Sequence, residues 1–377
     1  MTDRVLLPDP TDLGDLRRRL GSGDPSRRRP IGMDRIRIGP DVLDALPDDV
    51  AAIRRDGPVV VVMDETPMTR RGDDLKSAVV AMLGARFPTR PAVILAHGAE
   101  LHADADALAQ ADAAIVGAGC VVALGSGTIT DVAKDASHRA GDLPFAVVQT
   151  AVSVNAFSDD MAVLLRDGVK RTVPSRWPDV LLVDLDVIAG APPAMNQAGF
   201  GELCSMFTAP ADWYLAGAVG LDPSHDPAVV ALFRDGAEGL LDGAERVRML
   251  DPAMLAELAS RMTLTGIAMG VAGRTAPLSG TEHLLSHLLD MAGAAAGRRL
   301  AFHGAQVGVA GVFAATVWAD TLDQLDPERL LAAEAEPAPV AVGARVRAAF
   351  EPLDPTGRMA DECWRDVRAK LDRWRAA

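Results

Sequence analysis

Three histidines and one glutamate are the side chains of this sequence best suited to holding a metal ion. His283 and His287 lie four positions apart in "SGTEHLLSHLLD", and His303 follows in "AFHGAQVG". Residues four apart share one face of a helix, so the first two imidazoles would point the same way. Zinc and ferrous iron accept imidazole and carboxylate, and a catalytic site needs three protein ligands and one open position. Glu202, in the apolar stretch "GFGELCSMF", could supply the carboxylate.

Each of these residues also has an ordinary structural interpretation. A lone histidine is more often a hydrogen-bonded core residue, and Glu202 could be a helix cap. The cluster of three imidazoles with an acid in apolar surroundings favours the metal site. The spacing alone leaves open which histidines bind.

A glycine-rich turn provides a second candidate site. In "ALGSGTITDVAKDAS" (123–137), Gly125, Ser126 and Gly127 stand between an apparent strand and an apparent helix. Backbone N–H groups in such a turn approach a phosphate closely, and the helix N-terminus adds partial positive charge. A plain tight turn is equally compatible with this pattern. Lys134, further along, could contact a phosphate or be an ordinary exposed lysine.

Three further charged residues, in two segments, could contact ligands. Asp64 ends the run "PVVVVMD", where an acid could accept hydrogen bonds from a ribose hydroxyl. The alternative is a solvated loop aspartate. The segment "RDGVKRT" (166–172) predicts a hairpin that turns at Asp167-Gly168. Its Lys170 and Arg171 could hold an anionic substrate, or the hairpin could simply be exposed and cationic.

The elements that must position these residues follow a strand–helix alternation in the first half of the chain. Unbroken Val, Ile and Leu runs are typical of strands buried on both faces of a parallel sheet. Such runs occur at 58–64, 91–98, 119–127, 144–150 and 179–188. Helix-like segments lie between them, which indicates βαβ units.

The second half of the chain reads as helical. No strand-like run follows residue 194, and the segments 226–250 and 251–273 each open with Asp-Pro, a favourable helix start. We therefore predict a lead-in with a short helix over 1–30, a nucleotide-binding α/β domain over 31–190, and a helical metal- and substrate-binding domain over 191–377. A loop rich in Ala, Glu and Pro is predicted near 332–339.

Composition narrows the class of protein. The chain has 377 residues and a net charge of −14, which argues against a broad nucleic-acid surface but allows a small anionic substrate. Its three cysteines lack CxxC spacing, which predicts a reducing compartment and no thiolate zinc site. No signal peptide and no run of eighteen apolar residues occurs, so we expect a soluble, cytoplasmic protein without a membrane partner.

Several motifs in order carry a resemblance to a known family. The segments "GSGTITDVAK", "QTAVSVNAFSD", "AGFGELCSMFTAPADW", "SGTEHLLSH" and "FHGAQVGV" resemble those of glycerol-1-phosphate dehydrogenases over roughly residues 31–320. These enzymes belong to the superfamily of iron-containing alcohol dehydrogenases, glycerol dehydrogenases and dehydroquinate synthases. The resemblance implies a Rossmann-like parallel-sheet domain, an all-helical C-terminal domain, and an active site in the cleft between them.

The resemblance also assigns roles to the candidate residues. It implies that Glu202, His283 and His303 hold one divalent ion, zinc or iron. His287 then becomes a catalytic or supporting group beside the substrate, together with Asn155 and Lys170. The residues it implies for NAD or NADP binding are Asp64, Gly125, Ser126, Gly127, Asp131, Thr150 and Ser153. An acid at position 64, near the adenine ribose, favours NAD over NADP.

The chain departs from the family pattern mainly around the substrate. Asn155 replaces an Asp, Met206 replaces a Lys, and Ala305 and Gln306 replace an acid and a base in the usual "HGEKVG". Thr130 replaces an Asn, and the metal-binding acid is Glu where the nearest subfamily has Asp. These changes leave the implied metal ligands in place and make the substrate uncertain.

The leading hypothesis is a metal-dependent NAD(P)-linked oxidoreductase that interconverts a ketone and a secondary alcohol. The substrate would be small and polar, phosphorylated as in the glycerol-1-phosphate/dihydroxyacetone-phosphate pair, and the metal would act as a Lewis acid. One alternative is a cyclase of the dehydroquinate synthase type, which Glu202 mildly favours. Another is a catalytically silent nucleotide-binding homologue, suggested by the substitutions at 155, 206 and 305. We also expect a homo-oligomer.

Overall fold

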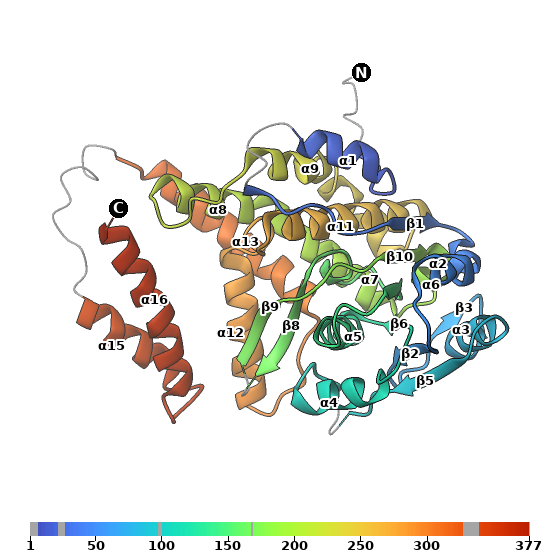
Figure 1. Cartoon of the computed structure of the whole chain (residues 1–377). Helices are drawn as coiled ribbons and strands as arrows, with labels where there is room; N and C mark the ends of the chain where they lie inside the picture. The colour runs from blue at the N-terminus through green and yellow to red at the C-terminus, as the bar shows by residue number, and fades with distance from the viewer. Residues whose placement is uncertain (1–6, 22–26, 97–99, 167–168, 327–338, 377) are drawn as a thin grey trace, which may run out of the picture.

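The first half of the chain forms a six-stranded parallel sheet with helices between its strands (Figure 1). The computed structural model describes residues 7–21, 27–96, 100–166, 169–326 and 339–376. In spatial order the strands are β1 (Arg35–Gly39), β10 (Val180–Asp184), β7 (Phe145–Gln149), β6 (Cys120–Gly125), β2 (Val59–Met63) and β5 (Thr89–Val93). Every neighbouring pair is parallel.

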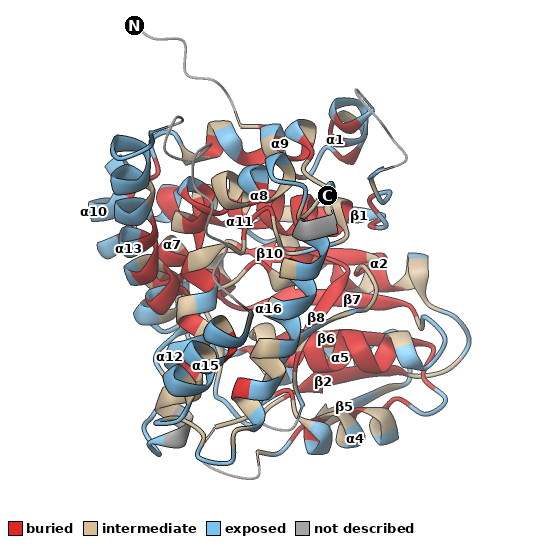
Figure 2. Ribbon diagram, turned by 90° about the vertical axis from the view of Figure 1, so that its left-hand side faces the viewer, coloured by how far each residue is buried: buried red, intermediate tan, exposed pale blue. Residues whose placement is uncertain are grey.

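Helices cover both faces of this sheet, as the unbroken apolar runs predict. Alternate strand residues enter two separate cores, so that Val60 and Val121 face one side while Val59 and Val122 face the other. The first core includes α4 (Ala105–Ala114) and α5 (Gly127–Arg139), and the second includes α2 (Leu46–Ile53) and α3 (Leu75–Gly84). Figure 2 shows the central strands and most of α5 as buried, whereas the edge strand β5 is largely exposed. Burial on both faces explains why these strands show no polar alternation.

The strand order places the predicted cofactor residues at one edge. β2 and β6 are spatial neighbours, but the chain runs outward from β2 to β5 before it returns to β6. Ligands of such open sheets bind beyond the carboxyl ends of the strands where the order reverses. Asp64 follows β2 and the Gly125–Gly127 turn follows β6, so both lie at this edge.

Local chemistry modifies some predicted elements. The apolar run 179–188 is not one strand: Asp184 accepts hydrogen bonds from the backbone of residues 186 and 187 and starts helix α6 (Leu185–Ala189). The predicted helix over 226–250 is divided into α9 (Pro227–Ala237) and α10 (Ala244–Arg248), with Gly239 at a φ of +77° between them. Strand β1 was missed because its alternating "RIRIG" is short and cationic.

After β10 the described residues form helices and no strand. The main ones are α7 (Pro193–Leu203), α8 (Ala209–Ala218), α11 (Pro252–Ala272), α12 (Thr281–Ala295) and α13 (His303–Asp323). The predicted hairpin exists as the antiparallel pair β8 (Met161–Arg166) and β9 (Val169–Pro174), and its turn at 167–168 lies outside the described residues. The fold class is thus confirmed, whereas the exact domain boundaries stay a prediction.

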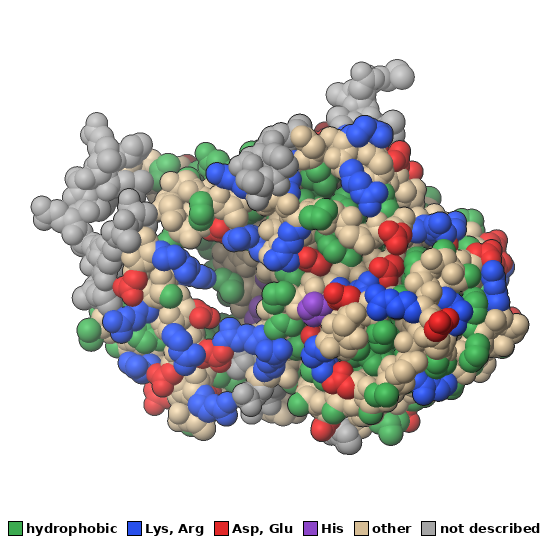
Figure 3. Space-filling model, in the orientation of Figure 1, with side chains coloured by type: hydrophobic (Ala, Val, Ile, Leu, Met, Phe, Trp, Pro, Cys, Tyr) green, Lys and Arg blue, Asp and Glu red, His purple; other side chains and the backbone are tan. Residues whose placement is uncertain are grey.

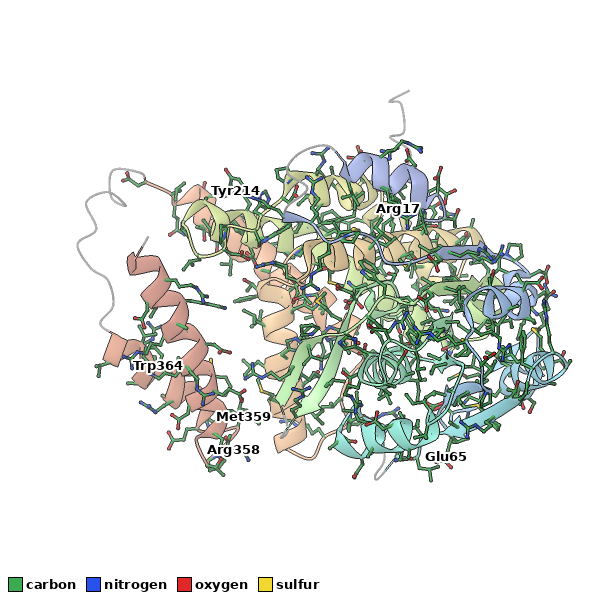
Figure 4. All side chains as sticks on the ribbon, in the orientation of Figure 1. Arg17, Glu65, Tyr214, Arg358, Met359 and Trp364 are labelled. Carbon is green, nitrogen blue, oxygen red and sulfur yellow. The ribbon has the colours of Figure 1, made fainter. Side chains whose placement is uncertain are left out.

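A separate pair of helices ends the chain. These are α15 (Pro339–Phe350) and α16 (Arg358–Ala376), which pack on each other. Near the N-terminus, the short helix predicted in the lead-in is α1 (Leu13–Leu20). Trp364 of α16 lies against Gly343 of α15 (Figure 4). Arg171 of β9 pairs with Glu362 and Asp366, which ties α16 to the β8–β9 hairpin. Most of the predicted Ala/Glu/Pro loop lies outside the described residues.

Helix α13 is long and apolar, although much of its surface is not buried inside the molecule. Among the described residues it is the one helix long and apolar enough to cross a membrane, and 28% of its most apolar window is buried. The expectation that no segment spans a membrane rested on the lack of eighteen consecutive apolar residues, and α13 too is interrupted by polar residues. Core helices meet the same two criteria, so length and composition do not by themselves place α13 in a membrane.

Glycines bring the backbones of α7 and α13 into direct contact. A Cβ added to Gly304 would lie 2.1 Å from the carbonyl oxygen of Ala198, and one on Gly201 would lie 2.2 Å from that of Gly304. A Cβ on Gly308 would lie 2.9 Å from the Cα of Gly201. Only residues without a side chain permit this approach. It places Glu202, next to Gly201, beside His303, next to Gly304.

We predict that Gly304→Ala and Gly201→Ala each lower the free energy of unfolding by about 1–3 kcal/mol or more, because the new methyl group overlaps backbone atoms that cannot move independently. Thermal unfolding followed by circular dichroism measures the effect. Gly84→Ala, at the end of α3 with open space around it, is the matched control and should keep the wild-type melting temperature. Wild-type stability in both packing variants would contradict the close contact.

Candidate metal centre and cofactor cleft

Glu202, His283 and His303 converge although they belong to three different helices. Glu202 lies in the last turn of α7, His283 in the first turn of α12, and His303 opens α13. The Nε2 atoms of His283 and His303 lie 3.5 Å and 3.7 Å from the two carboxylate oxygens of Glu202. A tetrahedral ion with bonds of about 2.1 Å separates its ligand atoms by about 3.4 Å. The observed separations therefore fit three ligands of one ion.

The electrostatics of Glu202 also fit a cation site. The residue is only 2% exposed. Burial alone would raise the pKa of Glu202, but the neighbouring His303 and His283 outweigh burial and hold the pKa below its ordinary value. Its Oε2 is buried and has no hydrogen-bond partner in the part of the chain that the structure describes, a costly arrangement for a carboxylate oxygen. A divalent ion between Glu202 and the two imidazoles would satisfy that oxygen.

His283 is fixed by a second carboxylate that the sequence analysis missed. Its Nδ1 lies 2.9 Å from Oε1 of the fully buried Glu282. Glu282 also accepts hydrogen bonds from the Thr208 hydroxyl and the Gly280 amide, both at 2.7 Å. Burial lowers the pKa of His283, but Glu202 and Glu282 outweigh it and raise that pKa to about 9. An acid beside a candidate ligand in "TEH" was the only sequence signal.

His287 lies beside this group without joining it. Its ring stacks on His303 with centroids 5.6 Å apart and planes at 17°, whereas the His283 centroid is 6.5 Å away. Burial is the main cause that lowers the pKa of His287 to about 4, and electrostatic interaction with His303 and Lys170 adds to it. His287, Asp290 and His303 could also group around an ion. However, the Lys170 ammonium pairs with Asp290 and places a positive charge there already.

A cavity of about 240 Å³ joins the metal centre to the start of α5. The predicted site residues that line it are Gly127, Asp131, Asn155, Lys170, Glu202, His283, His287 and His303. The surface in Figure 3 is hollowed between the helical half and the rest of the molecule, and histidine is visible in the hollow. The structure thus brings together residues separated by up to 176 positions in the sequence, from 127 to 303.

The other predicted cofactor residues lie along the carboxyl edge of the sheet. Ser126 precedes the first turn of α5, and Thr150 and Ser153 follow β7 with 6% and 7% exposure. Asp64 is not a free acceptor: its carboxylate pairs with Lys76 at 2.8 Å and accepts from the Thr66 hydroxyl at 2.7 Å. Cofactor binding by these residues, Gly125 included, stays a prediction.

Two cations considered as ligand contacts have structural roles instead. Lys134 is fully buried, and its ammonium donates to Asp159 at 2.6 Å and to the carbonyl oxygens of Ala156 and Met161. Arg171 pairs with α16, because neighbouring strand residues point to opposite faces. Of the two hairpin cations, Lys170 is the one that lines the cavity.

The comparison with known proteins agrees with this geometry. The family model described as iron-containing alcohol dehydrogenase matches residues 37–192. The glycerol-1-phosphate dehydrogenase [NAD(P)+] of Bacillus licheniformis is 30% identical over 294 residues, which cover 77% of this chain and 71% of that protein. The chain belongs to the iron-containing alcohol dehydrogenase family. The predicted family and enzyme class, an NAD(P)-dependent dehydrogenase, are confirmed.

Other matches are shorter or show the fold alone. The protein of the same name from Pyrococcus furiosus is 34% identical over 194 residues, and the match covers 52% of this chain and about half of that protein, 54%. The solved structure of a probable glycerol dehydrogenase from Sinorhizobium meliloti 1021 is 18% identical, with a TM-score of 0.59 over 93% of this chain and 100% of that one. Maleylacetate reductase from Rhizobium sp. strain MTP-10005 is 19% identical, with a TM-score of 0.55 over 86% of this chain and 90% of that one.

Asp131 gives a pH-dependent prediction. Burial raises the pKa of Asp131 from 3.8 to about 8, Asp159 adds to the increase, and Lys134 opposes it. Between pH 3.8 and about 8 the folded state keeps the carboxyl proton of Asp131, whereas the unfolded state releases it. The free energy of unfolding therefore falls as the pH rises toward 8. Asp131→Asn resembles the protonated form. Its melting temperature should exceed that of the wild type increasingly between pH 5 and 8, and a pH-independent difference would contradict a protonated Asp131.

Proposed function

We propose that this chain is a metal-dependent NAD(P)-linked oxidoreductase that interconverts dihydroxyacetone phosphate and glycerol-1-phosphate or a closely similar pair. The observation that carries the proposal is that the Glu202–His283–His303 group, with Glu202 and His283 buried and His303 partly exposed, opens into the same cavity as the glycine-rich start of α5. The name of the Bacillus licheniformis relative supports the substrate and the use of NAD(P).

The metal ligands and the cofactor residues would act from opposite ends of this cavity. Glu202, His283 and His303 would hold one zinc or iron ion, which when bound supplies a Lewis acid for the substrate oxygen. The turn at Gly125–Gly127 offers backbone N–H groups and the N-terminus of α5 to the cofactor phosphates. The nicotinamide supplies the hydride chemistry, and the protein positions it against the substrate.

Three side chains would position the substrate. Lys170 presents an ammonium to a phosphate group and is held at the cavity wall by Asp290. Asn155, 8% exposed, presents an uncharged amide to the cavity. His287 lines the cavity, and its buried Nδ1 has no hydrogen-bond partner among the described residues, so we assign to this imidazole the transfer of the proton that accompanies reduction or oxidation.

The proposal includes a second copy of the chain as partner. Several large apolar side chains are exposed on neighbouring helices α8, α12 and α13, namely Tyr214, Leu215, Leu284, Leu289, Val309, Val312 and Phe313. Figure 4 shows Tyr214 on α8, at the edge of the molecule. Extended apolar surfaces of this kind indicate contact with another protein.

The net charge of −14 supports the absence of a nucleic-acid partner, and we place the protein in the cytoplasm, with no membrane partner.

The reaction is tested by absorbance at 340 nm. The zinc- or iron-loaded protein should oxidise NADH or NADPH in the presence of dihydroxyacetone phosphate, whereas a cyclase would leave the absorbance unchanged. Chelation should abolish turnover, and His283→Ala should lose bound metal together with activity. His138→Ala changes an exposed histidine away from the site and serves as the control. Full activity of a metal-free preparation would refute the proposal.

Lys170→Ala tests the phosphate contact. Removing a charged donor costs about 1.5–3 kcal/mol, so KM for dihydroxyacetone phosphate should rise about tenfold or more while KM for unphosphorylated dihydroxyacetone changes little. Arg171→Ala is the matched control, since that guanidinium pairs with α16. Equal effects on the two substrates would exclude Lys170 as the phosphate ligand.

A further inference from the structure

Ser286 and Gln306 form a buried relay of two hydrogen bonds that ends at the imidazole of His303. Ser286 lies three residues after His283 on α12, and Gln306 lies three residues after His303 on α13, so each shares a helix face with a proposed ligand. The Ser286 hydroxyl oxygen is 3.0 Å from Nδ1 of His303 and 2.8 Å from Oε1 of Gln306. Ser286 is fully buried, and Gln306 is 9% exposed.

The number of available protons determines which atom is the donor in each of these two hydrogen bonds. A serine hydroxyl has one proton to donate, and here the Oε1 of Gln306 accepts it. The Ser286 oxygen must then accept a hydrogen bond from Nδ1–H of His303. This leaves the lone pair of His303 on Nε2, the atom that faces Glu202 at 3.7 Å. A ring nitrogen binds a metal through its lone pair, and its other nitrogen sets which tautomer is present.

The reverse orientation would produce the wrong tautomer. A donor at the position of the Gln306 oxygen would occupy one of the two lone pairs of the Ser286 hydroxyl and free the serine proton to be donated to Nδ1 of His303. Nε2 would then carry a hydrogen and point it toward the site of the ion. The identity of residue 306 therefore matters for His303, although the two side chains interact only through Ser286.

We propose that Gln306 is a positioning residue which, through Ser286, selects the metal-binding tautomer of His303. The inference rests on the metal centre of the proposed function and deepens it. Gln306 replaces a family base, which the sequence analysis treated as a loss near the substrate. In this chain the amide oxygen instead acts on a ligand of the ion. His283 has its own anchor in Glu282, so the two imidazoles are fixed independently.

Zinc affinity of the metal-free full-length protein, measured by competition with a chromophoric chelator, tests the proposal without an activity assay. Gln306→Met removes the acceptor at similar volume, and Ser286→Ala breaks the relay. Each should weaken zinc binding at least tenfold, in line with the usual 10–100-fold effect of lost outer hydrogen bonds. Gln306→Glu keeps an acceptor oxygen and should retain wild-type affinity or exceed it.

The tautomer itself is visible by NMR of protein labelled with ¹⁵N-histidine. The His303 signals, identified by their loss in His303→Ala, should show a protonated Nδ1 in the wild type and in Gln306→Glu. They should shift toward a protonated Nε2 in Gln306→Lys, which offers only donors. Circular dichroism reports whether each variant is folded, and the Glu and Lys variants keep the test valid if Gln306→Met is not.

The outcomes separate this inference from the proposed function. If the wild type binds zinc while Gln306→Met and Gln306→Lys keep its affinity and the His303 tautomer, the role of Gln306 is overturned and the metal centre stands. If the wild type binds no zinc, the metal centre fails and the inference fails with it.

Discussion

The contact between the backbones of α7 and α13 is the constraint on which the rest of the site depends. Glycines at 201, 304 and 308 let the two helices approach without intervening side chains, and the close approach fixes Glu202 opposite His303. Carboxylate and imidazole must both lie within about 2 Å of an ion to bind it. A displacement of one helix by the width of a methyl group would therefore open the group of ligands.

Further hydrogen bonds around this contact fix the orientation of the two imidazoles. Glu282, held by Thr208 and Gly280, orients one imidazole, and Ser286 with Gln306 orients the other. Buried polar groups are stable only when they are paired, and the one carboxylate oxygen of Glu202 left unpaired faces these rings. These surrounding groups orient the carboxylate and the imidazoles in a way that would stabilise a cation between them.

The cavity wall opposite the metal centre is held by charges buried for structural reasons. Lys134 links α5 to residues 156–161 through Asp159 and two carbonyl oxygens. This ion pair keeps Asn155 and the β8–β9 hairpin next to the glycine-rich turn, so that Lys170 reaches the cavity from β9. A lysine that looked like a ligand contact in the sequence instead supports the segment that carries the side chains proposed to face the substrate.

The sequence by itself determined the elements and most of the reactive groups. Runs such as "VVVV" at 59–62 specify buried strands because burial on both faces removes polar residues, and the motif order around Glu202, His283 and His303 indicated the family. Helical spacing alone could not rank His287 against His303, because it relates only residues on one helix and the proposed ligands lie on three; the family resemblance supplied that ranking. Nor could it show that Glu282, Ser286 and Gln306 orient the ligands, that Lys134 is buried, or that Arg171 faces α16. Those outcomes depend on contacts between distant segments, and only the tertiary structure fixes which hydrogen-bonding atoms meet there.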